Sequence, residues 1–517
     1  MKRSGIVVLR SSNIVVRCSM IVFLSSVGAL AGCYSPNTAS GAYLCDATGT
    51  CPTGQHCICG QCVNSDTEAA CAFAVTVAPP ACTDWPPAES NPPKNCVHEH
   101  QPFPVTVTAL QADKKTPATG FHAAVEVSSS WGDATLVSGG PGAFSNGTGT
   151  LMVSLDRETV GVAGGARIIV RAGTASGAAT TRVLVSAPRW KLDAQAALLP
   201  GAWADLYVTQ PDVLRLGDGY RMYFTGAGGK TPATYVEGIG VATSSDGKSW
   251  TLQPQPIARA GFQQWNKNNV DSPTAFVAST GEVRLLFKGS QSGLPFDNPD
   301  AVLGLATSTD GLAFSLPTMP VLTQKACVFC STGLTLPSAV PFSDVLPGGV
   351  QLYFSSSKKA NGVGADTPQI GHAISSDDGA TWDVDPFPVV SVNSEELAFS
   401  PHVFLEGTVY KMFFALASKV PPMPDINSLC NGAVQLNIAY ATSSDGLYWI
   451  RSLSNPIITS PVPAVAGPVS LLPGKVLPND PANPDKGLTL WYSVFQTVQT
   501  PFGNLCAPSG VYRATRD

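Results

Sequence analysis

The chain has 517 residues, of which 13% are charged, and its formal net charge at pH 7 is −5. It contains no basic stripe or Lys/Arg block that would neutralise phosphates, which argues against nucleic-acid binding. Its 49 glycines and 43 prolines separate short apolar runs, a pattern that predicts an all-β protein with many turns. Nothing in this composition indicates a cofactor or a metal site.

Residues 1–32 have the features of an export signal. Basic residues at positions 2, 3, 10 and 17 precede or enter an apolar stretch, 19–32, that is too short for an ordinary transmembrane helix. The sequence Leu30-Ala31-Gly32-Cys33 resembles the bacterial lipoprotein box, which implies cleavage before Cys33 and its acylation; a plain secretory signal is the alternative. Tyr34 follows instead of Asp, which by analogy with known sorting rules favours the outer membrane. We expect the rest of the chain to be soluble, in the cell envelope or at the cell surface, and anchored through lipid.

The segment 33–99 is rich in cysteine. An even number of cysteines in a short, exported, Gly/Pro-rich stretch predicts a disulfide module, whose pairing the sequence leaves open. The run CPTGQHCICGQC has a second interpretation as a metal-binding knuckle, which an oxidising compartment disfavours. The eight cysteines are Cys45, Cys51, Cys57, Cys59, Cys62, Cys71, Cys82 and Cys96.

Residues 100–187 alternate apolar and polar side chains in runs such as FPVTVTAL, GTLMVSL and ARIIVRAG. This period of two predicts strands with one buried face, and about seven short strands in about 90 residues fit an immunoglobulin-like sandwich. The stretch also resembles the Ig-like domains of bacterial surface proteins, which implies that it acts as a spacer.

Residues 188–517 consist of repeats. The segment SSDDGATW, 375–382, has shorter copies in SSDGKSW, STDGLAF and SSDGLYW, spaced about 65 residues apart. An apolar run such as YRMYFTG precedes each copy, and before it comes a run with Pro at its second position, such as QPDVLRL. Four strands per unit in five units predict a five-bladed β-propeller.

The fifth unit lacks its fourth strand, because the sequence given ends after GVYRATRD. The segment RWKLDAQAALLP, which begins at Arg189, aligns with the fourth strands of the other units and places Trp190 where they have Trp250, Phe314, Trp382 and Trp449. We therefore expect this upstream strand to complete the last sheet and leave no open edge.

The repeated SSDG-type segments are Asp-box-like hairpins between the third and fourth strands. Asp and Gly supply the tight turn, and the aromatic residue that follows packs between sheets. We interpret Asp246, Asp310, Asp377 and Asp445 as structural, ahead of a calcium-binding or catalytic role.

The remaining connections are long and gather on the opposite face, where loops usually carry function. Cys430 and Cys506 fall in equivalent loops of adjacent units, so we predict that they form a disulfide. Cys327 and Cys330 lie on the same face, and we expect them to pair locally; a redox role for this C-x-x-C lacks a thioredoxin-like context.

The first strand of each unit would line the axis, so residues around each x-Pro-x step would rim a central pocket. Acids on three units, Asp212, Asp271 and Glu396, are the candidate catalytic residues, because two convergent carboxyls can act as acid and base on a glycosidic bond. Gln210, His402 and Trp265 are the candidate substrate-binding residues.

The unit xPxV–YRMYFTG–GIGVATSSDGxxW resembles the five-bladed propellers of glycoside hydrolase families 43, 32 and 130, over about residues 189–517. The resemblance implies an acid just before the first Pro, where this chain has Gln210, with Asp212 two residues later. On the second unit, Asp271 lies one residue before the position that directly precedes Pro273. Glu396 lies four residues before Ser400.

Two functions follow from these patterns. The first is a lipid-anchored glycoside hydrolase-like enzyme, with Asp212 or Asp271 as base and Glu396 as acid. The second is a non-catalytic surface protein whose propeller binds glycan or protein, which Gln210 favours. A sialidase also carries Asp boxes, but five units and the lack of Arg at the x-Pro-x steps argue against it. We expect a monomer that recognises carbohydrate.

Overall fold

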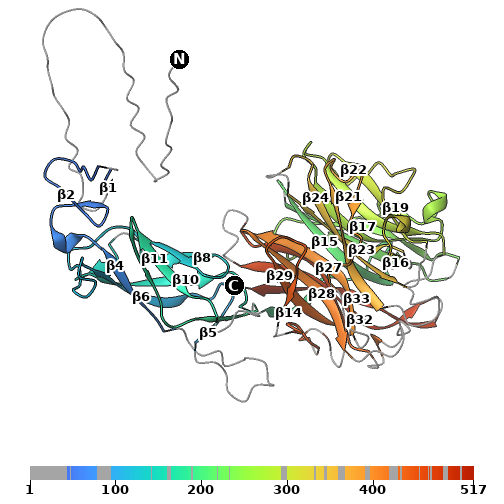
Figure 1. Cartoon of the computed structure of the whole chain (residues 1–517). Helices are drawn as coiled ribbons and strands as arrows, with labels where there is room; N and C mark the ends of the chain where they lie inside the picture. The colour runs from blue at the N-terminus through green and yellow to red at the C-terminus, as the bar shows by residue number, and fades with distance from the viewer. Residues whose placement is uncertain are drawn as a thin grey trace, which may run out of the picture.

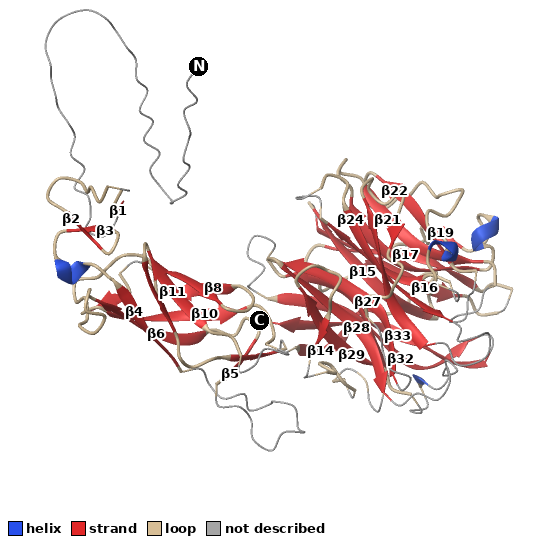
Figure 2. Cartoon of the chain, in the orientation of Figure 1, coloured by secondary structure: helices blue, strands red, loops and turns tan. Residues whose placement is uncertain are grey.

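The computed structural model describes most of the chain, and the ranges are 43–46, 48–78, 95–140, 142–159, 165–187, 190–217, 219–231, 233–292, 300–330, 333–342, 346–358, 367–390, 396–418, 429–430, 434–452, 455–460, 462–463, 465, 469–480, 487–500 and 503–516. Nearly all regular structure in these ranges is β-strand (Figure 2). Three short 3-10 helices accompany the strands: η1 (Asp66–Glu68), η2 (Gln264–Asn266) and η3 (Gln324–Ala326). Within the ranges given, no helix has the length and apolar character that a membrane crossing requires.

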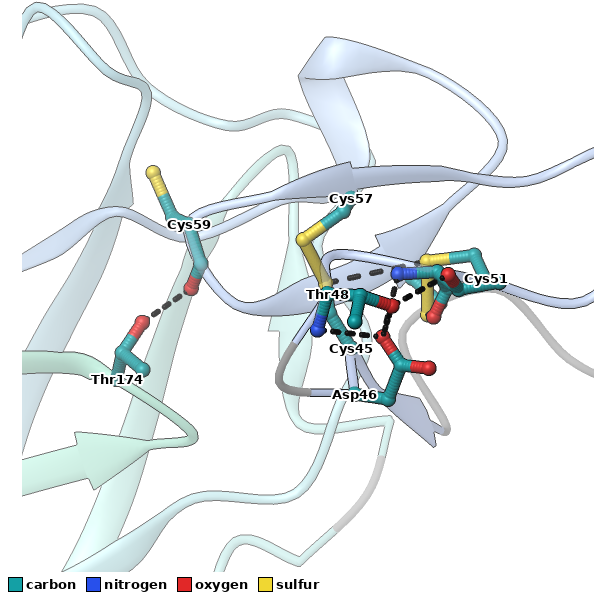
Figure 3. The surroundings of a disulfide bond; sticks show 9 residues. Cys45, Asp46, Thr48, Cys51, Cys57, Cys59 and Thr174 are labelled. Atoms are coloured by element: carbon teal, nitrogen blue, oxygen red, sulfur yellow. Dashed lines mark hydrogen bonds between the residues drawn. A yellow bond between two sulfur atoms is a disulfide. The ribbon is translucent and has the colours of Figure 1, made fainter.

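The N-terminal end is a small three-stranded sheet, ordered β1 (Tyr43–Leu44), β3 (Gln61–Val63) and β2 (His56–Ile58). Three disulfides hold it: Cys45–Cys57, Cys51–Cys62 and Cys59–Cys71. Figure 3 shows the Cys45–Cys57 bond and its surroundings. All four cysteines of the run at 51–62 are therefore oxidised, which leaves no thiolate there for the metal-knuckle interpretation. Cys45, Cys51 and Cys62 form the one metal-sized group of ligand atoms among the described residues, and all three are in these disulfides.

A two-sheet sandwich follows, and its strands show the alternating burial that the sequence predicted; β6, for example, buries Phe103, Val105, Val107 and Ala109. Both inner faces contribute to one apolar core, in which the Phe121 ring meets the edges of Phe73 and Phe144. One sheet contains β4 (Ala72–Val77), β6 (Phe103–Leu110), β10 (Thr148–Leu155), β8 (Ala134–Ser138) and β9 (Phe144–Ser145), and the other β12 (Ala175–Ala178), β11 (Ile168–Ala172) and β7 (Glu126–Ser129).

The sandwich extends N-terminally beyond the boundary expected at residue 100. β4 pairs with β6, and β5 (Cys96–His98) pairs in parallel with β13 (Leu184–Ser186). The reason is visible in β4, where every second residue, Phe73, Val75 and Val77, is buried in the sandwich core. Cys96 is disulfide-bonded, and Cys82 lies outside the described residues, as does Cys33.

Five antiparallel sheets make up the rest of the described chain (Figure 1). Sheet 1 is β15 (Tyr207–Leu216), β16 (Gly219–Gly228), β17 (Val236–Ser244), β18 (Thr251–Leu252) and β19 (Ala258–Arg259). Sheet 2 is β20 (Asn269–Val277), β21 (Val283–Ser290) and β22 (Val302–Ser308). Sheet 3 is β23 (Thr335–Pro341), β24 (Val350–Lys358), β25 (Thr367–Ser375) and β26 (Asp383–Val384).

Sheet 4 is β27 (Glu396–Glu406), β28 (Val409–Ser418), β29 (Asn437–Ser443) and β30 (Ile450–Arg451). Sheet 5 is β31 (Ser470–Pro478), β32 (Leu488–Thr500), β33 (Gly503–Arg516) and β14 (Lys191–Leu198). The first strands β15, β20, β23, β27 and β31 contact one another in that order, and β31 contacts β15 again.

The upstream strand completes sheet 5, as the repeat alignment predicted. β14 pairs antiparallel with β33, with Lys191 opposite Thr515. The Trp190 ring stands edge-on to Phe413 of sheet 4 at a centroid distance of 5.4 Å. Two aromatic residues at the equivalent position of other units also pack on the preceding sheet. Phe314 packs on Tyr223 of sheet 1, and Trp449 packs on Tyr353 of sheet 3.

The Pro step interrupts four of the first strands with a bulge. The residues before Pro, which are Gln210, Ser272, Leu336 and Ser400, have φ of 52°, 54°, 50° and 55°, a conformation that residues other than glycine seldom adopt. The ladder to the second strand shifts register at each of them. The N–H of Ser272 then donates to Thr225 of sheet 1 (2.9 Å), and that of Ser400 to Ser355 of sheet 3 (2.8 Å). Side-chain hydroxyls thus link neighbouring sheets where no backbone ladder does.

Candidate functional site

Three strand ends meet where sheet 1 faces the first strand of sheet 2. Tyr207 of β15 is opposite Ala227 of β16, which is opposite Glu237 of β17, so Tyr207 and Glu237 lie at the same edge. Asn269 at the start of β20 donates from Nδ2 to Glu237 Oε1 (3.2 Å). Asp271 follows Asn269 by two residues, so strand alternation places both side chains on one face of β20.

Glu237 is half-buried and hydrogen-bonded on both carboxyl oxygens. The Tyr235 hydroxyl donates to Oε2 (3.1 Å) and lies 3.3 Å from the Tyr207 hydroxyl. Burial and the negative charge of Asp271 raise the pKa of Glu237 to about 7, although the Lys288 ammonium acts in the opposite direction. A substantial fraction of Glu237 is therefore protonated at neutral pH.

Asp271 lies beside a cation. Lys288 Nζ on β21 is 2.8 Å from Asp271 Oδ2, and the Ser272 hydroxyl donates to Oδ1 (2.6 Å). The side chains of Lys288 and Asp271 are 2% and 9% exposed, so Asp271 retains the greater access to solvent. Two carboxyl groups and one ammonium share this edge, and the group is electrically neutral when Glu237 carries its proton.

Asp212 lies elsewhere, fully buried between first strands. Thr274 donates to its Oδ2 (2.9 Å), and Lys475 Nζ of β31 lies 3.5 Å away. Burial raises the pKa of Asp212, and the Lys475 ammonium opposes that effect. Thr274 and Ser338 occupy the same strand position in sheets 2 and 3, and each accepts an N–H of the next first strand, at 3.1 and 3.0 Å. This position connects neighbouring sheets.

Glu396 forms a two-bond pair with Arg451, at 2.9 Å to Oε2 and 3.2 Å to Oε1. Arg451 is on β30 of the same sheet, and its guanidinium lies over the Phe414 ring, 6.0 Å from the centroid. Each predicted acid thus has a cation of its own, and in the described part of the chain no hydrogen bond joins Asp212, Asp271 and Glu396 to one another.

The predicted binding residues are mostly committed to internal contacts. Gln210 Oε1 accepts hydrogen bonds from the Thr225 hydroxyl (2.6 Å) and from Ser272 N (3.1 Å), which ties sheet 1 to sheet 2. Trp265 stacks on Phe287 and is 9% exposed. His402 is 7% exposed, and burial together with the Lys475 charge lowers its pKa to about 3. Gln210 is linked to the Glu237–Asp271 edge, because the Ser272 hydroxyl contacts both Gln210 and Asp271.

The sequence interpretation missed Glu237. A signal was available in the repeats, because the residue that precedes the third strand's GIG-like segment is Glu237 in sheet 1 but Ala301, Pro368 and Leu436 in sheets 2, 3 and 4. An acid at a position that is uncharged in those units stands out from the shared pattern. The acids predicted from the repeats adjoin the x-Pro-x steps of the first strands, whereas Glu237 lies on the third strand of sheet 1.

Both disulfides expected in this part of the chain are present. Cys430 is bonded to Cys506 across sheets 4 and 5, and Cys327 is bonded to Cys330 beside η3. Cys506 lies within β33 and not in a loop as the repeats suggested, whereas Cys327 and Cys330 are three residues apart in one segment.

The comparisons with known proteins gave matches only among solved structures, since no family model and no curated protein matched. A thermostable family-43 glycoside hydrolase is 17% identical, with 59% of this chain and 88% of that chain covered and a TM-score of 0.41. A glycosyl hydrolase from Bacteroides ovatus is 11% identical, with 63% and 92% covered and a TM-score of 0.44. A structure described under "The GH130 family of mannoside phosphorylases contains glycoside hydrolases that target beta-1,2 mannosidic linkages in Candida mannan" is 13% identical, with 63% and 93% covered and a TM-score of 0.45. These TM-scores are below 0.5, so we draw neither fold nor function from them.

Proposed function

We propose that residues 190–516 form a five-bladed β-propeller in which each sheet is one blade, and that it recognises carbohydrate at the Glu237–Asp271 edge. The cyclic contacts of the five first strands and the pairing of β14 with β33 support the ring. Tyr207 and Tyr235 supply hydroxyls and aromatic faces at the same edge, a combination that suits sugar rings and their hydroxyl groups. The sandwich, which begins at β4, would be an Ig-like spacer.

The reaction that this edge supports is hydrolysis of a glycosidic bond. Glu237, with a pKa of about 7, is the proton donor to the leaving oxygen, and Asp271 is the carboxylate that activates water or attacks the sugar. Lys288 holds the Asp271 carboxylate in place through its 2.8 Å contact. The observation that carries this proposal is that Glu237 has a raised pKa and lies beside a second carboxyl group, Asp271, which is paired with Lys288.

Substitution of the two carboxyl groups tests the roles. Glu237→Gln and Asp271→Asn should each lower hydrolysis by at least about a hundredfold while glycan binding persists, because each substitution keeps shape and removes one proton-transfer group. A glycan array and a hydrolysis screen of the mature chain provide the substrates. Glu282→Gln, which changes an exposed acid in the β20–β21 hairpin, is the matched control.

Two outcomes would overturn the assignment. If Glu237→Gln hydrolysed substrate at the rate of the unaltered chain, Glu237 would not be the donor. Loss of hydrolysis in Glu396→Gln or Asp212→Asn alone would return the catalytic role to the acids that the repeat pattern suggested.

A second candidate is glycan binding without hydrolysis. The Lys288–Asp271 pair favours it, because a carboxylate neutralised by an ammonium is a weaker base. Saturable binding on the array with no released sugar, together with loss of binding in Asp271→Asn, would select this function over hydrolysis.

The placement of the protein at the membrane is also a proposal. It rests on the Leu30-Ala31-Gly32-Cys33 sequence, with the disulfide-bonded module and the sandwich between Cys33 and the propeller. Cys33→Ala should move the protein from the envelope membrane fraction to the soluble fraction and abolish labelling with a radioactive fatty acid. Unchanged membrane association would contradict a lipid anchor at Cys33.

A further inference from the structure

A second recess lies on the Asp-hairpin side of the molecule, at the seam where sheet 5 meets sheet 1. Its volume is about 410 Å³. The sheet 1 wall consists of Tyr220 and the hairpin residues 246–248, and the sheet 5 wall includes Thr489, Trp491, Arg513 and Thr515. None of these residues belongs to the Glu237–Asp271 edge, so this recess is separate from the site proposed above.

The contacts across this seam differ from those across two other seams. The Tyr223 hydroxyl of sheet 1 donates to the Gly311 carbonyl in the hairpin of sheet 2 (2.9 Å), and Tyr353 of sheet 3 does the same to Gly446 of sheet 4 (3.0 Å). Sheet 5 has Trp491 at that strand position, and its indole N–H is buried without a hydrogen-bond partner.

The hairpin of sheet 1 is correspondingly less tightly held. A Cβ built on Gly247 would lie 3.6 Å from the Trp491 ring, whereas one built on Gly311 would lie 2.8 Å from the Tyr223 hydroxyl. Thr489, Arg513 and Thr515 line the space beside this hairpin.

Hydrogen-bond donors dominate the free groups of this recess. Among the described residues, the Lys248 ammonium and the Thr515 hydroxyl make no hydrogen bond or ion pair, while Arg513 uses only Nε, toward Asp193 (2.6 Å). The acceptors are partly engaged: Asp246 Oδ1 receives the N–H groups of its own turn, and Asn479 Oδ1 receives the Thr489 hydroxyl. Asp246 also brings a negative charge to the recess, because the hydrogen bonds of its turn lower its pKa to about 2.

Cations exceed anions at the same place, because Lys248, Arg513 and Arg215 outnumber the carboxylates of Asp246 and Asp193. Lys248 and Arg513 flank the recess, and the Arg215 guanidinium lies over the Tyr220 ring, 5.5 Å from its centroid. Unused guanidinium, ammonium and hydroxyl donors are the groups that bind a carboxylate. A volume of this size accommodates a ring-bearing molecule beside Tyr220, beyond what a bare ion requires.

We propose that this recess binds the carboxylate-bearing sugar unit of an acidic glycan. Arg513 and Lys248 contact the carboxylate, and the Thr515 hydroxyl contacts the sugar. The occupant is either a free acidic monosaccharide or a terminal unit of an acidic polysaccharide. This site does not depend on catalysis at Glu237 and Asp271.

Calorimetric titration of the mature chain with galacturonate, glucuronate, glucose and an oligogalacturonide tests the proposal. Either uronate should bind, and glucose should bind at least about tenfold more weakly, since it lacks the carboxylate. Equal affinity for the uronates and the oligomer indicates recognition of a single unit, whereas tighter binding of the oligomer identifies a polysaccharide end.

Lys248→Leu is the informative variant because Leu312 and Leu447 occupy this position in two other hairpins, so the turn should still form. We expect Lys248→Leu and Arg513→Gln each to weaken uronate binding by about tenfold. Lys267→Leu removes one charge from an exposed position away from the seam and should leave the affinity unchanged.

The proposal fails if no uronate binds, if glucose binds as well as the uronates, or if Lys248→Leu and Arg513→Gln leave the affinity unchanged. Acetate that competes at the same concentration as galacturonate would show a site for simple anions and overturn the sugar assignment. Asp271→Asn separates the two sites, because it should alter the edge between sheets 1 and 2 and leave uronate binding intact.

Discussion

At the scale of single residues, environment decides what each carboxyl group can do. Glu237 and Asp212 both have a raised pKa, and burial is the main cause for each. Glu237 is half-buried beside Asp271, whereas Asp212 has no exposed surface and accepts a hydrogen bond from Thr274. Only a group that substrate can reach can transfer a proton to it, which favours Glu237 over Asp212.

Hydrolysis by this chain should fall as the pH rises through about 7. In the proposed mechanism the proton donor is Glu237 in its protonated form, and its pKa of about 7 means that this form disappears above that pH. A pH–rate profile between pH 5.5 and 8.5 measures the effect. A rate that stays flat or increases across pH 7 would contradict the role of Glu237.

Protonation of Glu237 also affects stability in a defined direction. Its pKa is higher in the folded chain than the ordinary value of 4.5, so the folded state binds more protons than the unfolded state between about pH 4.5 and 7. The contribution of this carboxyl to the free energy of unfolding therefore decreases as the pH rises through that window. Glu237→Gln should remove the corresponding part of the pH dependence.

At the scale of elements, the side chain at one position of the second strand differs between sheets and makes different contacts with the next hairpin. The second-strand residue that faces the next hairpin is Tyr223 in sheet 1, Tyr353 in sheet 3 and Trp491 in sheet 5. The two tyrosines bond the hairpin carbonyl, while the tryptophan leaves a recess. Seams with the same backbone register therefore differ in the side chain that faces the hairpin and in the contacts that it makes.

Two buried tyrosines allow a matched test of this hydroxyl bond. Tyr223→Phe should lower the free energy of unfolding by about 1–2 kcal/mol, because it leaves the buried Gly311 carbonyl unpaired. Tyr492 is equally buried, but its hydroxyl has no partner among the described residues, so Tyr492→Phe should be neutral or slightly stabilising. Urea unfolding of both variants measures the difference, and equal losses in the two would contradict the role of the bond.

At the scale of the whole molecule, a buried charge network connects the sandwich to sheets 4 and 5. Lys411 Nζ lies 2.8 Å from Glu99 of the sandwich and 2.5 Å from Glu406. Arg516 contacts Glu406 at 2.9 Å, and His100 contacts the same carboxylate at 2.7 Å. All these side chains are at most 3% exposed. Burial and Lys411 lower the pKa of His100, which favours its neutral form.

Removal of the central cation should weaken the whole chain. Lys411→Met leaves Glu99 and Glu406 buried with less compensation, so we expect a loss of about 3–5 kcal/mol. Arg451→Met breaks the partly exposed pair with Glu396, whose side chains are 31% and 21% exposed, and should cost about 1 kcal/mol or less. Calorimetry should also show separate unfolding of the two parts in Lys411→Met. A single transition at the original temperature would contradict this role.

The repeats allowed much of the architecture to be predicted. Short, recurring segments with an alternating apolar pattern specify strands, and the Asp and Gly of each SSDG-type segment specify the hairpin turn. Both signals depend only on residues that are close in the sequence. Even the long-range pairing of β14 with β33 followed, since the missing fourth strand of the last unit had a matching copy upstream. The Cys430–Cys506 disulfide followed from the equivalent positions of the two cysteines in adjacent units, and Cys327–Cys330 from the expectation of local pairing on the same face.

The sequence by itself determined the strands, the turns and the order in which near-copies pair, because those depend on local periodicity and repetition. Only the tertiary structure decided which charges meet: it paired Glu396 with Arg451, buried Asp212, and brought Glu237 to Asp271. It also joined Glu99 to Lys411 across 312 residues. Such contacts depend on which faces of distant sheets come together, and the energy of a buried charge depends on every neighbour within a few ångströms, none of which a one-dimensional pattern records.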